Sequence, residues 1–210
     1  MKYLILVSLC VFMAVPLFGQ GSFTDFHIGF LFPADAKTGL IGGIYTGRMV
    51  DEAVGFGIEL DFYRKTYTED TEFPAGTSGQ VEETRIIPDV ENATTMLPLL
   101  FKLNFAVPVA EKLAVRVNGG VGYEIMWNSV KQYSEHIDDT KFYHGFAWMI
   151  GAGLSIPLSR ASDIFIEADY HGSSPSRGEG ETEEGAPIRT EVDMSGMLLR
   201  VGLRLFTIGF

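Results

Sequence analysis

Large apolar residues and small or charged residues alternate one by one over long stretches of this chain. From Phe56 to Phe62, every second residue is large and apolar, and the residues between are glycine or acidic. The same period of two runs through 115–127 and 199–205. Strict alternation over such lengths predicts β-strands that bury one face. No stretch after residue 19 shows a sustained helical period, so we expect an all-β protein.

The alternating segments and the connections between them predict a topology. Eight strands are expected at about 23–32, 40–48, 54–65, 94–106, 113–128, 141–156, 163–171 and 193–206. The connections at 49–53, 107–112 and 157–162 are short; 65–93 and 172–192 are long and polar, 129–140 is intermediate and 33–39 is brief. Short turns at one end and longer loops at the other are typical of a transmembrane barrel. The predicted fold is an eight-stranded antiparallel up-and-down β-barrel.

The two faces of the strands decide between a membrane barrel and a soluble one. One face is almost purely Phe, Leu, Ile and Val, while the other mixes glycine with Arg, Lys, Glu and Asp. The lumen of an eight-stranded barrel is just wide enough for side chains to fill it. The glycine-rich charged face fits that lumen and the bulky face fits lipid. We therefore expect Leu60, Val117, Val121, Ile150, Ile166 and Val201 to face outward. A lipocalin-like soluble barrel, apolar inside, is the alternative.

The N-terminus has the pattern of an export signal. Lys2 precedes an apolar run from Tyr3 to Phe18, and Gly19 follows. This order predicts a cleaved secretory signal peptide at 1–19, with the barrel at 20–210; a retained membrane anchor is the alternative. The only cysteine, Cys10, would leave with the signal, so the mature chain would have no thiol chemistry.

Charge excludes one class of partner. The formal net charge of −11 becomes −12 when Lys2 leaves with the signal. A chain this acidic is not attracted to nucleic acid or to anionic lipid by its net charge. We predict no nucleic-acid partner and no cofactor.

Two segments resemble a known family. Met96-Leu97-Pro98-Leu99-Leu100-Phe101-Lys102-Leu103-Asn104-Phe105, followed after a turn by Gly119-Gly120-Val121-Gly122-Tyr123, is similar to the porin-like outer-membrane β-barrel domain, and Val201-Gly202-Leu203-Arg204-Leu205 resembles the closing strand of OmpX-type barrels. The resemblance implies a bacterial outer-membrane location and insertion by the barrel assembly machinery. It implies no particular activity, because such folds carry many roles.

The C-terminus departs from that family's pattern. The last strand of such barrels usually ends in an aromatic residue on the lipid face, but Leu205 occupies that place in the alternation. Phe206 and Phe210 follow, and strict alternation would place Phe210 toward the lumen. A β-bulge near Phe206 or Thr207 would restore the phase. Either phenylalanine is a candidate for the assembly signal.

Charged residues on the inward face form the main candidate site. Placed by their distance from the short turns, nine of them gather in the lower half of the lumen: Asp25, Glu59, Asp61, Lys102, Arg116, Glu167, Asp169, Arg200 and Arg204. Five acids and four bases nearly balance, and adjacent strands bring opposite charges together. Because buried charges must be paired, we predict an ion-pair plug. A charged ion path or a catalytic carboxylate set is the alternative.

A possible nucleophile pair lies where the seventh predicted strand ends. His171-Gly172-Ser173 is followed by acidic residues at 181–184. A lipid A deacylase family has a His-x-Ser pair near the membrane edge, and a base beside a serine is the usual nucleophile arrangement. The asparagine that usually follows that family's serine is Ser174 here. We predict no enzyme and keep His171 and Ser173 as weak catalytic candidates.

The remaining residues of chemical interest indicate structure and surface. His27, His136 and His144 have no metal-ligand spacing, so we predict no metal site. The acidic segment 178–185 is low in complexity and is expected to be a solvated loop tip. Aromatic residues near the upper strand ends predict an interfacial girdle: Tyr63, Trp127, Phe142, Tyr143 and Tyr170.

The function expected from the sequence is therefore an integral outer-membrane barrel, acting in envelope structure or surface interaction. We expect periplasmic termini, extracellular long loops, a single copy surrounded by lipid, and a surface ligand that the sequence does not specify. A narrow channel for small solutes or ions is the second hypothesis, and a lipid A-modifying hydrolase the third.

Overall fold

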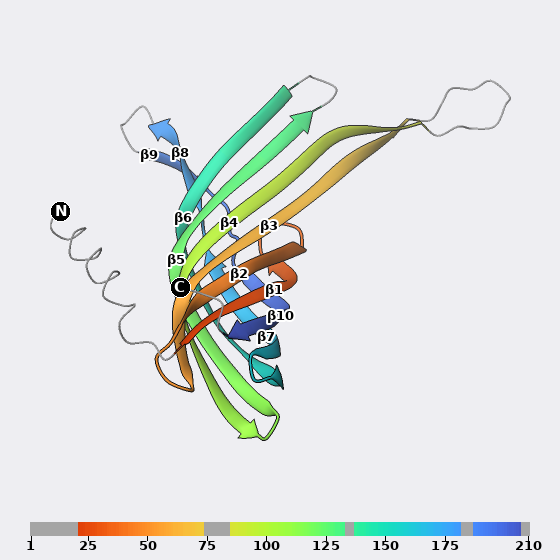
Figure 1. The fold of residues 1–210 in the computed structure, drawn as a ribbon. Helices are drawn as coiled ribbons and strands as arrows, with labels where there is room; N and C mark the ends of the chain where they lie inside the picture. Colours follow the sequence, from red (N-terminus) through yellow and green to blue (C-terminus); the bar gives the residue numbers. More distant parts are fainter. Residues whose placement is uncertain (1–20, 74–84, 133–136, 182–186, 207–210) are drawn as a thin grey trace, which may run out of the picture.

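The computed structural model describes residues 21–73, 85–132, 137–181 and 187–206, which form ten strands (Figure 1). The strands are β1 (Gly21–Pro33), β2 (Gly39–Met49), β3 (Val54–Phe73), β4 (Arg85–Ala110), β5 (Leu113–Gln132), β6 (Ile137–Ser159), β7 (Ser162–Ser173), β8 (Ser176–Glu181), β9 (Pro187–Glu191) and β10 (Gly196–Phe206). Among these residues no helix is long and apolar enough to cross a membrane.

Eight of the strands close into one antiparallel barrel. Their order is β5-β4-β3-β2-β1-β10-β7-β6, and the pairing of β5 with β6 closes the ring. β8 and β9 form a separate hairpin within the connection from β7 to β10, and β8 touches β6 at the single pair His144–Ser176. The predicted eight-stranded up-and-down barrel is confirmed, including the pairing of the first strand with the last.

The apolar face of the barrel points outward, as predicted. The tested side chains are all exposed, from 45% of the surface of Leu60 to 60% of that of Ile166. On β3, β5, β7 and β10 the inward positions carry buried charges, whereas those of β6 carry uncharged residues such as Ala147 and Met149. A soluble barrel would need the reverse arrangement, so that alternative is wrong. The outer face is instead suited to contact hydrocarbon.

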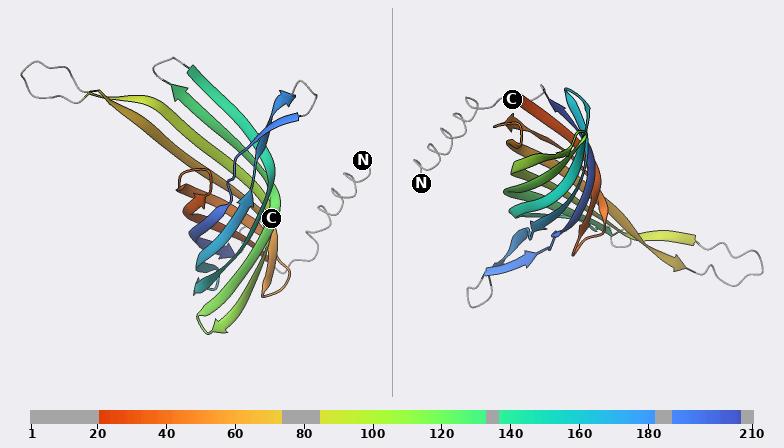
Figure 2. Two further views of the ribbon diagram at one scale, coloured as in Figure 1. Left: turned by 180° about the vertical axis from the view of Figure 1, so that it is seen from behind. Right: turned by 90° about the horizontal axis from the view of Figure 1, so that it is seen from below.

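The barrel wall is tall on one side and low on the other. The neighbouring strands β3, β4, β5 and β6 contain 20, 26, 20 and 23 residues, and we call them the tall wall. The strands β7, β10, β1 and β2 contain only 11 to 13. The tall wall extends beyond the low side as two long hairpins, which are visible in Figures 1 and 2.

Several predicted loops are strands in the structure. β3 and β4 continue through most of 65–93 and stay paired up to Phe73 and Arg85, with one irregularity between Glu69 and Asp70. β5 and β6 likewise take up most of 129–140, and 172–192 contains the β8–β9 hairpin. Conversely, residues 193–195 belong to no strand, although the prediction started the last strand there.

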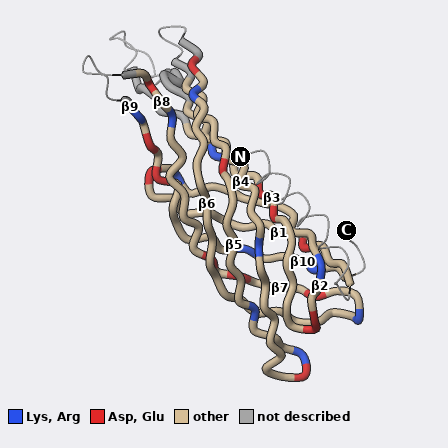
Figure 3. The backbone as a smooth tube through the Cα atoms, turned by 90° about the vertical axis from the view of Figure 1, so that its left-hand side faces the viewer, with Lys and Arg blue, Asp and Glu red and all other residues tan. Residues whose placement is uncertain are grey.

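The short turns lie at the same end of the barrel as the start of β1 and the end of β10. β1 begins beside the end of β2, because Gly21 pairs with Met49, and β10 ends beside the start of β7, where Leu205 pairs with Ser162. We call this the turn end and the opposite one the hairpin end. Figure 3 shows charged residues at both ends and along the barrel wall. Ten of the charged residues that the structure describes in the barrel strands are buried, and nine of these form the candidate site.

Candidate functional site

All nine charged residues of the predicted lumen site are buried in the structure. We call them the lumen charge network: Asp25, Glu59, Asp61, Lys102, Arg116, Glu167, Asp169, Arg200 and Arg204. They come from six of the eight barrel strands, and none has more than 3% of its surface exposed. The period of two places them inside, because the residues that flank them on their own strands face outward, except for the buried Thr24 beside Asp25.

The part of the network nearest the turn end, which we call its lower part, is centred on Asp25. Arg204 binds this carboxylate through two nitrogens, at 2.6 and 2.8 Å, and Arg116 reaches it at 2.8 Å. The Asp25–Arg204 contact joins directly paired residues of β1 and β10. Arg116 also lies 2.8 Å from Glu167, and this contact links the lower part to the middle of the lumen. Paired forks of this kind are among the stronger hydrogen bonds in proteins.

The middle part is centred on Arg200. Its guanidinium lies 2.9 Å from Glu59, 3.2 Å from Glu167 and 2.8 Å from Asp169. Lys102 adds a second cation, 2.7 Å from Glu59 and 3.7 Å from Glu167. Acids and bases therefore alternate across the lumen, and each carboxylate in this part has a cation within ion-pair distance.

Aromatic rings pack against the cations. The Arg204 guanidinium lies 4.3 Å from the ring centre of Phe23, and that of Arg116 lies 4.0 Å from the ring centre of Phe165. Lys102 is 4.9 Å from the ring centre of Tyr45. These contacts fill the space beside the charges at the turn end and contribute cation–π attraction.

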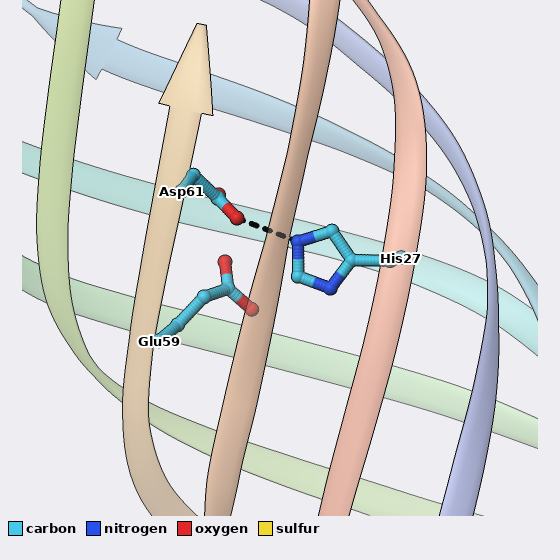
Figure 4. A group of neighbouring side chains, drawn as sticks. All are labelled: His27, Glu59 and Asp61. Atoms are coloured by element: carbon cyan, nitrogen blue, oxygen red, sulfur yellow. Dashed lines mark hydrogen bonds and ion pairs between the residues drawn. The ribbon is translucent and has the colours of Figure 1, made fainter.

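One group in the network has the chemistry of a metal site. His27, Glu59 and Asp61 point toward one another, with ligand atoms within 4.8 Å (Figure 4). However, His27 Nε2 lies 2.6 Å from Asp61 Oδ1, and Glu59 already binds two cations. Arg200 also lies 3.4 Å from His27. A divalent ion here would have to displace or face a fixed guanidinium, so we assign the three residues to the ion-pair network.

An apolar layer closes the lumen above the charges. It consists of the buried residues Leu31, Ile41, Tyr63, Met96, Leu100, Met126, Tyr143, Ala147, Met149, Met194 and Leu198. On β1, β3, β4, β5 and β10 these residues lie closer to the hairpin end than the charges do. Arg200 donates a hydrogen bond to the Met149 sulfur at 3.4 Å, which joins the two layers.

The apolar layer was not predicted from the sequence. One signal was present, because Met126 lies on the inward face of the alternation in β5. Tyr63 and Tyr143 were assigned to the lipid-facing girdle, and this was wrong: their exposed fractions are 0% and 4%. Trp127, Phe142 and Tyr170 are exposed on the outer face, as predicted.

Two segments on the low side fold over the lumen. We call residues 34–38 and 192–195 the lumen cap. The backbone N–H of Asp35 donates to the carbonyl of Asp193, and the N–H of Asp193 donates to the Asp35 carboxylate, both at 2.9 Å. Met194 is fully buried and packs into the apolar layer. The cap therefore continues the filling of the lumen toward the hairpin end.

The weak catalytic pair is buried but not arranged for nucleophilic attack. His171 Nε2 bonds to Glu124 at 2.8 Å, and neither side chain has more than 3% of its surface exposed. Ser173 Oγ is buried without a hydrogen-bond partner among the described residues, so His171 does not bond to it. Glu124 was not among the site residues predicted from the sequence. Of the predicted acidic segment, 178–181 belongs to β8, whereas 182–185 lies outside the described residues.

Other predicted features are only partly described. Residues 1–19, His136 and Phe210 lie outside the described residues. His144 lies on the outer face, and its Nδ1 is 2.6 Å from the hydroxyl of Tyr123. Phe206 is the last residue of β10 and pairs with Phe23.

Comparison with known proteins identifies the fold. The sequence matches no protein-family model and no curated protein sequence. Three solved structures are similar: Ail, the attachment invasion locus protein of Yersinia pestis (11% identity, 90% of this chain and 98% of that chain, TM-score 0.50); Neisserial surface protein A (12%, 89% and 97%, 0.51); and the outer membrane protein OprG from Pseudomonas aeruginosa (12%, 91% and 98%, 0.51). At these identities the likeness concerns the fold, which is that of the small eight-stranded outer-membrane β-barrels.

Proposed function

We propose that this protein is a bacterial outer-membrane barrel with a sealed lumen, whose role is to hold hairpins at the cell surface for envelope structure or surface interaction. The observation that carries the proposal is the filling of the lumen. A charge network that is nearly balanced occupies its lower half, and an apolar layer with a cap lies above it. The barrel is then a rigid anchor, and the parts free to meet partners are the hairpins.

The outer surface supports residence in a membrane. Bulky apolar side chains cover the wall, and soluble proteins rarely expose such a continuous surface. Trp127 packs near Phe142, and Trp148 near Tyr170, with ring centres 6.3 and 5.6 Å apart. These aromatic pairs lie toward the hairpin end, where we place one membrane interface. Lipid, with a single copy of the chain, is the environment we propose.

The packing of the lumen argues against a channel. An ion crossing the barrel would first have to pass the charged side chains around Arg200. It would then meet the apolar layer, in which side chains such as Tyr63 and Met96 have no exposed surface. Opening the lower part would separate ion pairs in a region with little water, at a cost of several kcal/mol. We therefore prefer an anchor to the channel of the second hypothesis.

The same packing argues against a hydrolase. His171 Nε2 is occupied by Glu124, and Ser173 lies inside the wall rather than facing lipid. A lipid substrate would have no path to this serine. The proposed role therefore includes no chemistry.

Membrane orientation can be tested with single cysteines, because Cys10 falls within the predicted signal and the mature barrel has no other. Glu179→Cys places a thiol in the exposed part of the β8–β9 hairpin, and Glu111→Cys places one in the exposed turn between β4 and β5. In intact cells, a membrane-impermeant maleimide should label only Glu179→Cys. Glu111→Cys should react after the outer membrane is permeabilised. The wild type serves as the control for a retained signal. If only Glu111→Cys were labelled in intact cells, the turn end would face the outside and the proposed orientation would be wrong.

A further inference from the structure

The hairpin end of the barrel contains a pocket that no part of the proposed anchor role requires. Its volume is about 680 Å³, which is within the range of small-molecule sites. The tall wall forms one side and residues 34–38 of the lumen cap form the other. Met126 and Val192 contribute apolar surface where the pocket meets the apolar layer. We call this pocket, which opens at the hairpin end of the filled lumen, the cup.

The charges in this cup are unusual for so acidic a chain. Two lysines line the pocket, Lys37 from the cap and Lys65 from β3, against one acid, Asp35. The Asp35 carboxylate already accepts the backbone N–H of Asp193. Within the described residues, no ion pair is formed by either lysine, although Lys37 lies 4.9 Å from the ring centre of Tyr67. Two cations without carboxylate partners favour an anionic ligand.

The amides of the cup have unused acceptors. Asn92 donates through Nδ2 to the hydroxyl of Tyr67 at 2.8 Å, but its Oδ1 is buried without a hydrogen-bond partner among the described residues. The Oδ1 atom of Asn128 is also buried without a hydrogen-bond partner among the described residues. A buried acceptor without a partner costs free energy, so it favours a ligand or a water that donates hydrogen bonds. Hydroxyl groups supply such donors.

From these features we propose that the cup binds a small hydroxylated anion of the sugar-acid class. The carboxylate of the ligand faces Lys37 and Lys65, and its hydroxyls donate to the Asn92 and Asn128 amide oxygens. The ligand is a free solute, because the cup opens inside the ring of strands rather than on the lipid-facing wall. The inference rests on the proposed sealed lumen, because the apolar layer forms the floor of the pocket.

Binding can be measured with D-glucuronate on the purified barrel in detergent micelles. Isothermal titration should detect glucuronate and give much weaker or no binding for D-glucose, which has the hydroxyls but no carboxylate. Lys65→Gln should weaken glucuronate binding about tenfold, the loss of one charge-assisted contact. Lys112→Gln, in an exposed turn at the opposite end, should bind like the wild type.

Methyl NMR of methionine locates the ligand independently of affinity. The Met126 methyl signal, assigned with Met126→Leu, should shift on adding glucuronate, whereas that of Met149, which lies deeper beside Arg200, should not. Absence of binding at 10-fold excess over about 1 mM protein, equal binding of glucose, or equal affinity in Lys65→Gln would each overturn the proposal. Inorganic phosphate binding as tightly as glucuronate would overturn the sugar-acid assignment. None of these outcomes alters the labelling result, so failure here is distinct from failure of the anchor role.

Discussion

Arg200 holds together the middle of the lumen charge network. Its guanidinium lies within 4.0 Å of four carboxylates, those of Glu59, Asp61, Glu167 and Asp169. Its side chain has no exposed surface, so the carboxylates around it depend on it rather than on solvent for their partner. A buried carboxylate that loses its partner destabilises a protein by about 3–5 kcal/mol.

The first prediction is therefore a loss of stability in Arg200→Ala. The free energy of unfolding, from urea titration in lipid vesicles, should fall by about 3–5 kcal/mol because buried carboxylates lose their shared cation. Arg160→Ala, in the exposed turn between β6 and β7, is the matched control and should change it by less than about 0.5 kcal/mol. Equal effects of the two substitutions would show that the network is not buried as described.

Two glycines make room for carboxylates of the network. Gly43 pairs with Asp61 and Gly151 pairs with Asp169, each across adjacent strands. A Cβ atom at Gly151 would lie 2.7 Å from the Asp169 Cα, a distance that side chains do not tolerate. At Gly119 on β5, the nearest atom to a new Cβ would be 3.7 Å away, an ordinary contact.

The second prediction compares alanine at these positions. Gly151→Ala should lower the free energy of unfolding by about 1–3 kcal/mol, the usual cost of overpacking a filled interior. Gly119→Ala should leave it nearly unchanged. Urea titrations of the two variants under the same conditions make the comparison. If Gly151→Ala were as stable as the wild type, the space beside Asp169 would have to be larger than the structure shows.

The charged residues of the site could be predicted from the sequence, and the apolar layer could not. A charge that alternates with lipid-facing residues, such as Glu59 between Ile58 and Leu60, can only point inward. The hydrophobicity of an apolar residue gives no such indication, because it suits both lipid and a packed lumen, so only the alternation can indicate its face, as it does for Met126. Tyr63 and Tyr143 were assigned to the girdle by their closeness to the strand ends, and were therefore placed on the wrong face. The His171–Glu124 contact joins β7 to β5, which are not neighbours in the ring, so no local pattern indicates it.

At the scale of elements, the predicted strand positions were correct inside the hydrocarbon region and too short beyond it. Alternation marks a strand only where one face meets lipid and the other does not. In 66–73 threonine and acidic residues replace most of the apolar ones, although β3 continues. The pairing of β3 with β4 there depends on backbone hydrogen bonds, which the sequence pattern does not report.

The third prediction is that the far part of the β3–β4 hairpin is dispensable for folding. Glu69 and Val90 are paired, so an Asn-Gly turn can join them in place of residues 70–89. The shortened chain should fold and unfold at the same urea concentration as the wild type, because the lumen charge network and the apolar layer lie below the cut. Failure of the shortened chain to form a barrel in detergent would show that the hairpin is needed for assembly.

At the scale of the whole molecule, the ring of strands produces the sealed lumen. Closure brings β1 against β10, and only then do Asp25 and Arg204 meet. The strands of the low side end sooner than those of the tall wall. The lumen cap fills part of the space at their hairpin ends and inserts Met194 into the apolar layer. The topology was predictable from strand count and connection lengths, whereas the cap, which consists of irregular backbone, was not.

The central claim, a sealed lumen, is tested most directly by single-channel recording in planar lipid bilayers. The purified barrel should insert and give no steady conductance steps, because neither the Arg200 cluster nor the apolar layer leaves a path for ions. A large porin inserted under the same conditions serves as the positive control, and insertion of the barrel is verified by its resistance to extraction from the lipid. Steady, reproducible conductance steps of the wild-type barrel would contradict the account and show that the charges of the lumen line a path.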